Sequence, residues 1–105
     1  MPKYLLSYHG GSAPDSPAEG EKVMKAWMDW MGGLGKALVD GGNPTGPSKT
    51  IGAKGKVSAG GGSNPVTGYS IVEAKTLDDA VTMSKGCPQI ASGGTIEVSE
   101  LTPIM

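Results

Sequence analysis

His9 is the only histidine in this chain of 105 residues, and it closes an apolar run directly before Gly10 and Gly11. Histidine is the side chain whose ordinary pKa lies closest to neutrality, so an imidazole here could accept and release a proton at physiological pH. The chain has a single cysteine and no phosphate-loop pattern that would indicate a different chemistry. Proton transfer would therefore run through His9 or through a carboxylate.

Asp40 is the carboxylate that we expect to work with this imidazole. It ends a second short apolar run, residues 37–40, just before Gly41 and Gly42. A carboxylate beside an imidazole raises the pKa of the ring and fixes which nitrogen carries the proton, as a general base requires. The alternative is that His9 hydrogen-bonds a loop and Asp40 caps a turn, because an isolated histidine is often structural.

Three more polar residues are candidates for ligand binding: Asn43, Tyr69 and Ser70. Asn43 opens the rigid segment 43–47 after Asp40, although turn chemistry alone also explains that segment. Tyr69 and Ser70 lie at the start of a predicted strand. No nucleophile-elbow pattern surrounds Ser70, so we expect it to contact a ligand and not to attack one.

The aromatic and sulfur side chains favour packing over chemistry. Trp27 and Trp30 lie on one stripe of a predicted helix, which indicates a core or a subunit interface in preference to a ligand platform. The neighbouring methionines would fill gaps, or would form an adaptable apolar pocket. Cys87 precedes Pro88 at a predicted helix end, and we expect a buried structural thiol.

The elements that must position these residues follow from hydrophobic spacing and capping signals. Ser16, Pro17 and Glu19 predict the start of a helix that ends among the glycines of 32–35, and Thr76 and Asp79 predict the start of a second. The inner stripe of this second helix is expected at 77, 80, 81 and 84, and Gly86 and Pro88 should end it. Main strands are expected over 4–9, 37–40, 68–73 and 95–101, with a weak hairpin from 49–51 and 56–58.

This order is β-α-β, a hairpin, and β-α-β. It predicts an α+β fold in a single domain, residues 1–105, with two helices packed on one face of an antiparallel sheet.

Charge and ligand patterns argue against several partners. The formal net charge is −1, and the nine basic residues are all lysines scattered along the chain, so we expect no nucleic-acid surface. One histidine with isolated carboxylates falls short of a zinc ligand set within one chain, although two copies of His9 could meet across a dimer axis. The glycine runs lack the strand–GxGxxG–helix context of a dinucleotide site. We predict no metal and no cofactor.

The single cysteine excludes an internal disulfide and fits a reducing compartment. No basic and apolar leader opens the chain, and no apolar stretch approaches the roughly 20 residues that a membrane helix needs. We therefore expect a cytoplasmic protein without membrane contact.

Several segments together resemble the YCII-related family, small ferredoxin-like proteins related to the dimeric α+β barrels. The resemblance lies in segments 3–6, 38–42, 68–74, 77–80, 87–88 and 93–98. A large branch of that family carries an Asp-Gly-Pro-Phe motif, which is missing here: segment 61–66 takes its place, and the chain has no phenylalanine. The resemblance implies a ferredoxin-like fold and a homodimer whose sheets pack into a barrel-like assembly.

In a ferredoxin-like sheet the first and second main strands are parallel and the third is antiparallel to them. His9, Asp40 and Tyr69 would then converge at one edge of the sheet. Some YCII-related proteins have been proposed to use a His–Asp pair, and relatives include an enzyme that eliminates chloride from a chlorinated aromatic compound. Their histidine lies elsewhere in the chain, so the resemblance gives His9 no inherited role.

Two functions remain open on the sequence. The first is a small enzyme that performs proton transfer, of the isomerase or lyase type, on a cyclic or aromatic small molecule with His9 as base and Asp40 as its partner. The second is a non-catalytic dimeric module that binds a small molecule or a protein in the same cleft. A structural accessory domain is a third, less favoured alternative.

Overall fold

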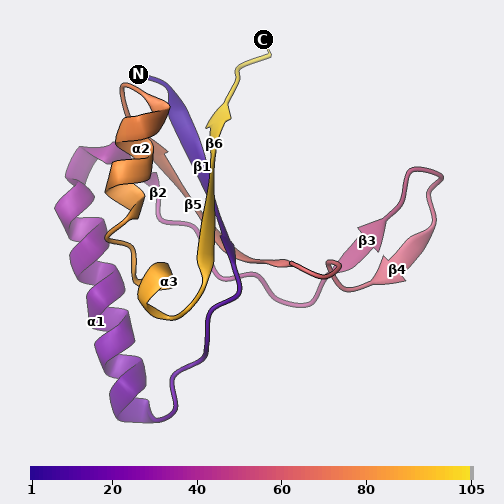
Figure 1. The fold of residues 1–105 in the computed structure, drawn as a ribbon, viewed down its shortest axis with the longest axis horizontal. Coiled ribbons are helices and arrows are strands. Elements are labelled where there is room, and N and C mark those ends of the chain that lie inside the picture. Colours follow the sequence, from indigo (N-terminus) through magenta and orange to yellow (C-terminus); the bar gives the residue numbers. More distant parts are fainter. Residues whose placement is uncertain (105) are drawn as a thin grey trace.

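The computed structural model describes residues 1–104, and it shows three α-helices, a turn of 3-10 helix and six strands (Figure 1). In chain order these elements are β1 (Lys3–His9), α1 (Pro17–Leu34), η1 (Gly35–Ala37), β2 (Leu38–Asp40), β3 (Lys49–Ile51), β4 (Val57–Ala59), β5 (Val66–Glu73), α2 (Leu77–Ser84), α3 (Pro88–Ala91) and β6 (Thr95–Leu101). The short helix α3 and the turn η1 were not predicted. Pro88 was expected only to end the second helix, but it is also the first residue of α3.

Four strands form one antiparallel sheet in the order β2-β5-β1-β6. Leu6, near the middle of β1, lies opposite Ser70 of β5 and Val98 of β6. Because β1 and β2 are both antiparallel to β5, they run in the same direction, as predicted. The helices cover one face of this sheet, which confirms the predicted α+β architecture (Figure 1).

Local capping defines both long helices as the sequence predicts. The Ser16 side chain accepts a hydrogen bond from the backbone N–H of Glu19 at 3.2 Å, with Pro17 at the first helical position. The Thr76 side chain accepts from the backbone N–H of Asp79 at 3.1 Å. Helix α1 ends at Gly35, whose φ of 54° lies in the region that favours glycine.

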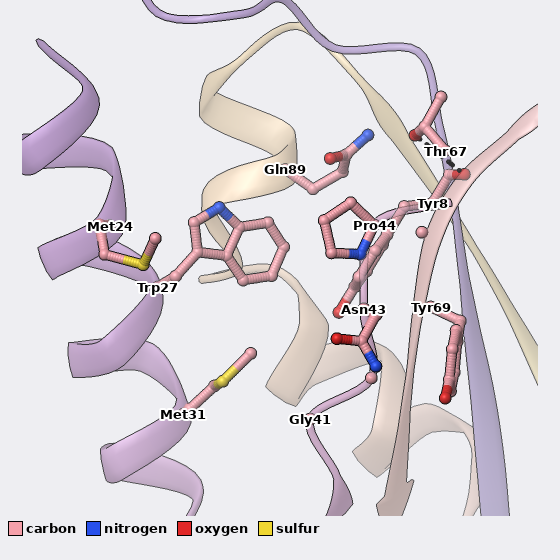
Figure 2. Close-up of a pocket in the computed structure, with 12 residues that line it drawn as sticks. Tyr8, Met24, Trp27, Met31, Gly41, Asn43, Pro44, Thr67, Tyr69 and Gln89 are labelled. Atoms are coloured by element: carbon pink, nitrogen blue, oxygen red, sulfur yellow. Dashed lines mark hydrogen bonds between the residues drawn. The ribbon is translucent and has the colours of Figure 1, made fainter. Parts of the chain in front are cut away.

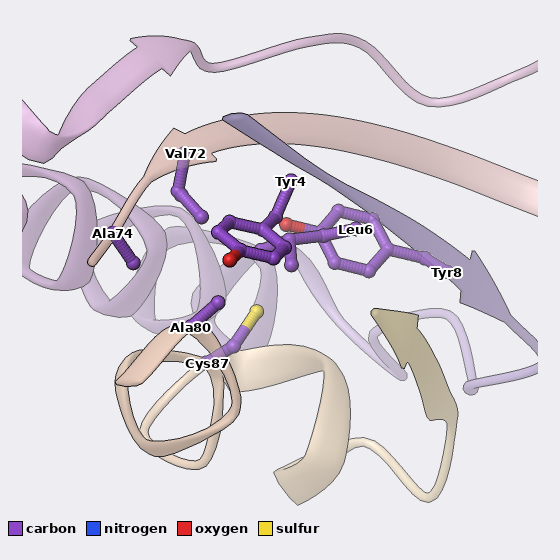
Figure 3. Close-up of a cluster of buried hydrophobic side chains, with 7 residues drawn as sticks. All are labelled: Tyr4, Leu6, Tyr8, Val72, Ala74, Ala80 and Cys87. Atoms are coloured by element: carbon purple, nitrogen blue, oxygen red, sulfur yellow. The ribbon is translucent and has the colours of Figure 1, made fainter. Parts of the chain in front are cut away.

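The core lies between β1, β5 and the helices (Figure 3). Its buried side chains are Tyr4, Leu6, Tyr8, Val72, Ala74, Ala80 and Cys87. Trp27 and Trp30 pack against this cluster, and the Trp30 indole N–H donates to the backbone carbonyl of Met83 at 3.0 Å. Both tryptophans therefore support the core, and the Cys87 thiol is free and buried, as predicted.

The inner stripe predicted for α2 is half wrong. Ala80 and Ser84 are buried, but Leu77 and Val81 are exposed and Met83 packs against the core instead. The small side chains of Ala80 and Ser84 face the sheet, which leaves the two larger residues at the rim of the helix.

The other face of the sheet carries no helix. We call it the open face, and strand alternation places on it Leu5, Ser7, His9, Tyr69, Ile71, Glu73, Glu97 and Ser99. Strands β3 and β4 form the predicted hairpin, which Figure 1 shows projecting from the sheet on the side away from the helices.

Candidate functional site

A pocket of about 280 Å³ lies on the helix side of the sheet, between α1 and the start of β5 (Figure 2). It is open to solvent at the surface of α1, where the Met24 side chain is 62% exposed. The residues that line it are Tyr8, Met24, Trp27, Met31, Gly41, Gly42, Asn43, Pro44, Thr67, Gly68, Tyr69 and Gln89.

One wall of the pocket is a stripe of α1. Met24, Trp27 and Met31 are three and four residues apart, so they share one face of the helix and point toward the loop after β2 (Figure 2). The Trp27 ring meets the ring of Tyr8 edge-to-face, with centroids 5.4 Å apart. Met24 and Met31 therefore line an apolar pocket, which was one of the two roles that the sequence left open for the methionines. Trp27 packs against the core and also lines the pocket.

The opposite wall is the loop 41–44, which is tied tightly to β5. Gly42 has a φ of 69°, and a Cβ at this position would overlap the backbone carbonyl of Tyr69. Pro44 forms an isolated bridge with Gly68, and the backbone N–H of the following Thr45 donates to the carbonyl of Thr67 at 3.0 Å. These contacts hold Asn43 at the pocket, where it was predicted to bind a ligand.

A chain of hydroxyl groups lies beneath the pocket. The Tyr8 hydroxyl donates to Ser70 Oγ at 2.7 Å, and the Ser70 hydroxyl donates to the backbone carbonyl of Gly41 at 2.8 Å. Burial raises the pKa of Tyr8 well above its usual range, so its phenol stays protonated at neutral pH. Ser70 itself is fully buried and does not line the pocket; it supports Tyr8 and the loop.

Tyr8, Thr67 and Gln89 were not selected from the sequence. Gln89 Nε2 donates to the carbonyls of His9 and Gly10 at 3.0 and 3.2 Å, so it fixes the end of β1 beside the pocket. The signal for Tyr8 was present, since Tyr4, Leu6 and Tyr8 alternate on one face of the first strand. Gln89 gave no signal because it belongs to the unpredicted helix α3.

His9 lies on the open face, on the other side of the sheet from this pocket. Its Nδ1 is 3.0 Å from the backbone carbonyl of Asn64, and its Nε2 is 3.9 Å from a carboxylate oxygen of Glu97. A carbonyl can only accept, so Nδ1 carries the proton and Nε2 holds the lone pair in the neutral ring. The carboxylate that accompanies the imidazole is thus Glu97 on the neighbouring strand β6.

The expected convergence of His9 and Asp40 is wrong. His9 lies opposite Val66, whereas Asp40 lies opposite Ile71, five positions further along β5. The Asp40 carboxylate instead accepts a hydrogen bond from the backbone N–H of Gly42 at 2.8 Å, which is the turn-capping alternative. Parallel direction alone does not align strand ends, because the short strand β2 pairs with the far half of β5.

Tyr69 has its backbone and its side chain at different places. Tyr69 is a lining residue of the pocket, and its backbone carbonyl lies against Gly42. The ring points to the open face, since Gly68 and Ser70 on either side of it face the helices, and Figure 2 shows it directed away from Trp27. The structure therefore brings Asn43 and the backbone of Tyr69 together at the pocket, and leaves His9 and the Tyr69 ring on the open face.

None of the residues that line the pocket carries an ionised side chain, so the pocket holds no fixed charge.

Across residues 1–104, no group of three histidine, cysteine or carboxylate side chains is arranged to hold a metal ion. Within the same range, no helix combines the length and apolar character needed to cross a membrane.

No protein-family model matches the chain, and no curated protein matches it. Among solved structures, it is similar to 5-chloro-2-hydroxyhydroquinone dehydrochlorinase from Burkholderia phenoliruptrix, determined in complex with 2,5-dihydroxybenzoquinone. The TM-score is 0.57, the identity is 16%, and the alignment covers 95% of this chain and 93% of the other. This similarity shows the fold. The ferredoxin-like α+β arrangement expected from the sequence is therefore confirmed for the described residues.

Proposed function

We propose that the protein takes up a small, uncharged, ring-shaped organic molecule in the pocket between α1 and β5. The observation that carries this proposal is the composition of the pocket: an indole and two thioethers on one wall, a few uncharged polar residues, and no ionised side chain. Such a site favours a flat, uncharged ligand, because an ion would lose its hydration without gaining a partner. The volume of about 280 Å³ exceeds the roughly 150 Å³ of a cavity that holds benzene, so one substituted ring fits.

Two polar groups would orient the ring. The Tyr8 hydroxyl donates to Ser70, and the phenol oxygen would act as an acceptor for a hydroxyl substituent of the ligand. The Asn43 side chain at the opposite wall offers both a donor and an acceptor. This pattern favours a phenol-like or quinol-like molecule. The fold neighbour, a dehydrochlorinase solved with a dihydroxybenzoquinone, supports the same ligand class.

We also propose that the protein is a YCII-related homodimer in which the open faces of two sheets pack together. The open face carries Leu5 and Ile71, which are half-buried although no helix covers them. A second sheet would complete the burial of these side chains, as face-to-face packing does in two-layer folds.

Proton-transfer catalysis on the same ligand class is the second candidate function. The observation that favours it is the orientation of His9: Nδ1 donates to Asn64, and the Nε2 lone pair is left beside Glu97. His9 Nε2 would take a proton from the substrate, and the Glu97 carboxylate would stabilise the resulting imidazolium. The substrate of this reaction would have to bind on the open face, between the subunits.

Binding can be tested with hydroquinone, which is uncharged at neutral pH, and with benzoate, an anion of similar ring size. We expect hydroquinone to bind with saturation in a calorimetric titration and benzoate to bind at least tenfold more weakly. Met24→Glu should weaken hydroquinone binding about tenfold, because it places a charge at the apolar mouth of the pocket.

Met28→Glu is the matched control. Met28 lies on the same helix and is similarly exposed, at 66% against 62% for Met24, but it does not line the pocket. Its affinity for hydroquinone should stay within twofold of the wild type. Equal losses in the two variants, or tighter binding of benzoate, would rule out this pocket as the site.

A further inference from the structure

The β3–β4 hairpin has no visible role in the fold of a single copy. All six of its strand residues are exposed, and it projects away from the sheet (Figure 1). The radius of gyration is 15.1 Å, against about 13 Å for a compact domain of this size. We call this hairpin, residues 48–60, the arm.

The arm has an apolar face and a polar face. Ile51 pairs with Val57, and alternation places both on the face opposite to the pair Thr50 and Ser58, with the pair Lys49 and Ala59 at the base of the same face. Ile51 is 72% exposed and Val57 is 54% exposed. An isolated two-stranded hairpin is marginally stable in water, so an exposed apolar face on one indicates a surface to which it binds.

Charge distinguishes the arm from the rest of the chain. The arm contains three of the nine lysines, Lys49, Lys54 and Lys56, and none of the ten acidic residues. The remainder of the chain carries six lysines against ten acidic residues. A positive arm and a negative body are complementary, so a second copy of this chain is an electrostatically suitable partner for the arm.

The direction of the arm agrees with this partner. It projects on the side of the sheet that the helices leave open, where a second copy would sit in the proposed homodimer (Figure 1). That open face presents Glu97, whose side chain is 71% exposed, and the half-buried Glu73. In a dimer of this kind the basic arm of one copy would face carboxylates on the other.

We propose that the arm is a dimer clamp, in which the apolar face formed by Ile51 and Val57 packs against the body of a second copy. This inference rests on the homodimer proposed above. By the two-fold symmetry of such a dimer, each arm would hold the other subunit, and the two contacts would add to the area buried between the sheets.

The test is the dimer dissociation constant, measured by analytical ultracentrifugation over a range of protein concentrations. Ile51→Asp and Val57→Asp change the apolar face, and Ser58→Asp introduces the same side chain on the polar face of the same hairpin. We expect the first two to raise the dimer Kd about tenfold or more, since each replaces a buried aliphatic contact with a charge, and Ser58→Asp to leave it within twofold.

The near-ultraviolet circular dichroism of Trp27 and Trp30 reports whether the body of each variant remains folded. A monomeric wild-type protein would overturn the homodimer and the clamp together. A dimeric wild-type protein whose Kd is the same in all three variants would overturn the clamp alone and leave the homodimer standing.

Discussion

Tyr8 belongs both to the buried core and to the lining of the pocket. Its ring is buried against Trp27, and its hydroxyl is the first donor in the chain that passes through Ser70 to Gly41. The raised pKa of this phenol keeps it neutral at physiological pH, so Tyr8 is not available as a base.

The same burial predicts a loss of stability in alkaline solution. Tyr8 keeps its proton in the folded state, whereas an unfolded tyrosine loses it near pH 10, so rising pH stabilises the unfolded chain. Burial also raises the pKa of the Cys87 thiol, which acts in the same direction from a lower pH. We expect the free energy of unfolding in urea to be constant near neutrality and to fall increasingly above about pH 9.

Tyr8→Phe should reduce this slope above pH 10 by about 1.4 kcal/mol per pH unit, the contribution of one proton. The free energy of unfolding of this variant and of the wild type, measured between pH 7 and 11, checks the expectation. Identical slopes in the two proteins would show that the phenol ionises in the folded state.

At the scale of elements, the two segments that form the walls of the pocket both contain glycine, but only one of them requires it. The loop 41–44 needs Gly42, because its positive φ and its approach to the Tyr69 carbonyl leave no room for a side chain. In α1, Gly32 has helical neighbours and no atom within 4 Å of an added Cβ.

Two Gly→Ala substitutions should therefore have opposite effects. Gly32→Ala should stabilise the protein by about 0.5–1 kcal/mol, since alanine favours the helix. Gly42→Ala should destabilise it by about 1 kcal/mol or more and weaken hydroquinone binding, because the pocket wall must move. Thermal unfolding measures the first effect and calorimetry the second. A stable Gly42→Ala variant with unchanged affinity would contradict the rigid loop.

The elements that could be predicted from the sequence are those specified by local chemistry. The caps at Ser16 and Thr76 and the glycine end of α1 depend on residues a few positions apart. The pairing of Asp40 with Ile71 depends on contacts between distant segments, and no local signal encodes it. Loop position accordingly places Asn43 at the pocket, where its binding of a ligand stays a prediction, whereas the expected meeting of His9 with Asp40 was wrong.

At the scale of the whole molecule, the two faces of the sheet carry different kinds of residues. The helix side holds an uncharged pocket, and the open face holds His9 with Glu97. Successive side chains of a strand point to opposite faces of the sheet, so Tyr8 faces the helices and the adjacent His9 faces the open side. The sequence indicated that both residues belong to a strand, but which face the helices cover is a property of the complete fold.

A small ring molecule is proposed to bind on the helix side of the sheet. Nuclear magnetic resonance tests it directly, since Trp27 lines the pocket and Trp30 donates its indole N–H to Met83, while His9 reports on the open face. On titration with hydroquinone, we expect a saturable shift of the Trp27 indole resonance, with smaller changes at Trp30 and none at the His9 ring. A saturable shift of the His9 ring resonances with an unchanged Trp27 indole would contradict binding on the helix side.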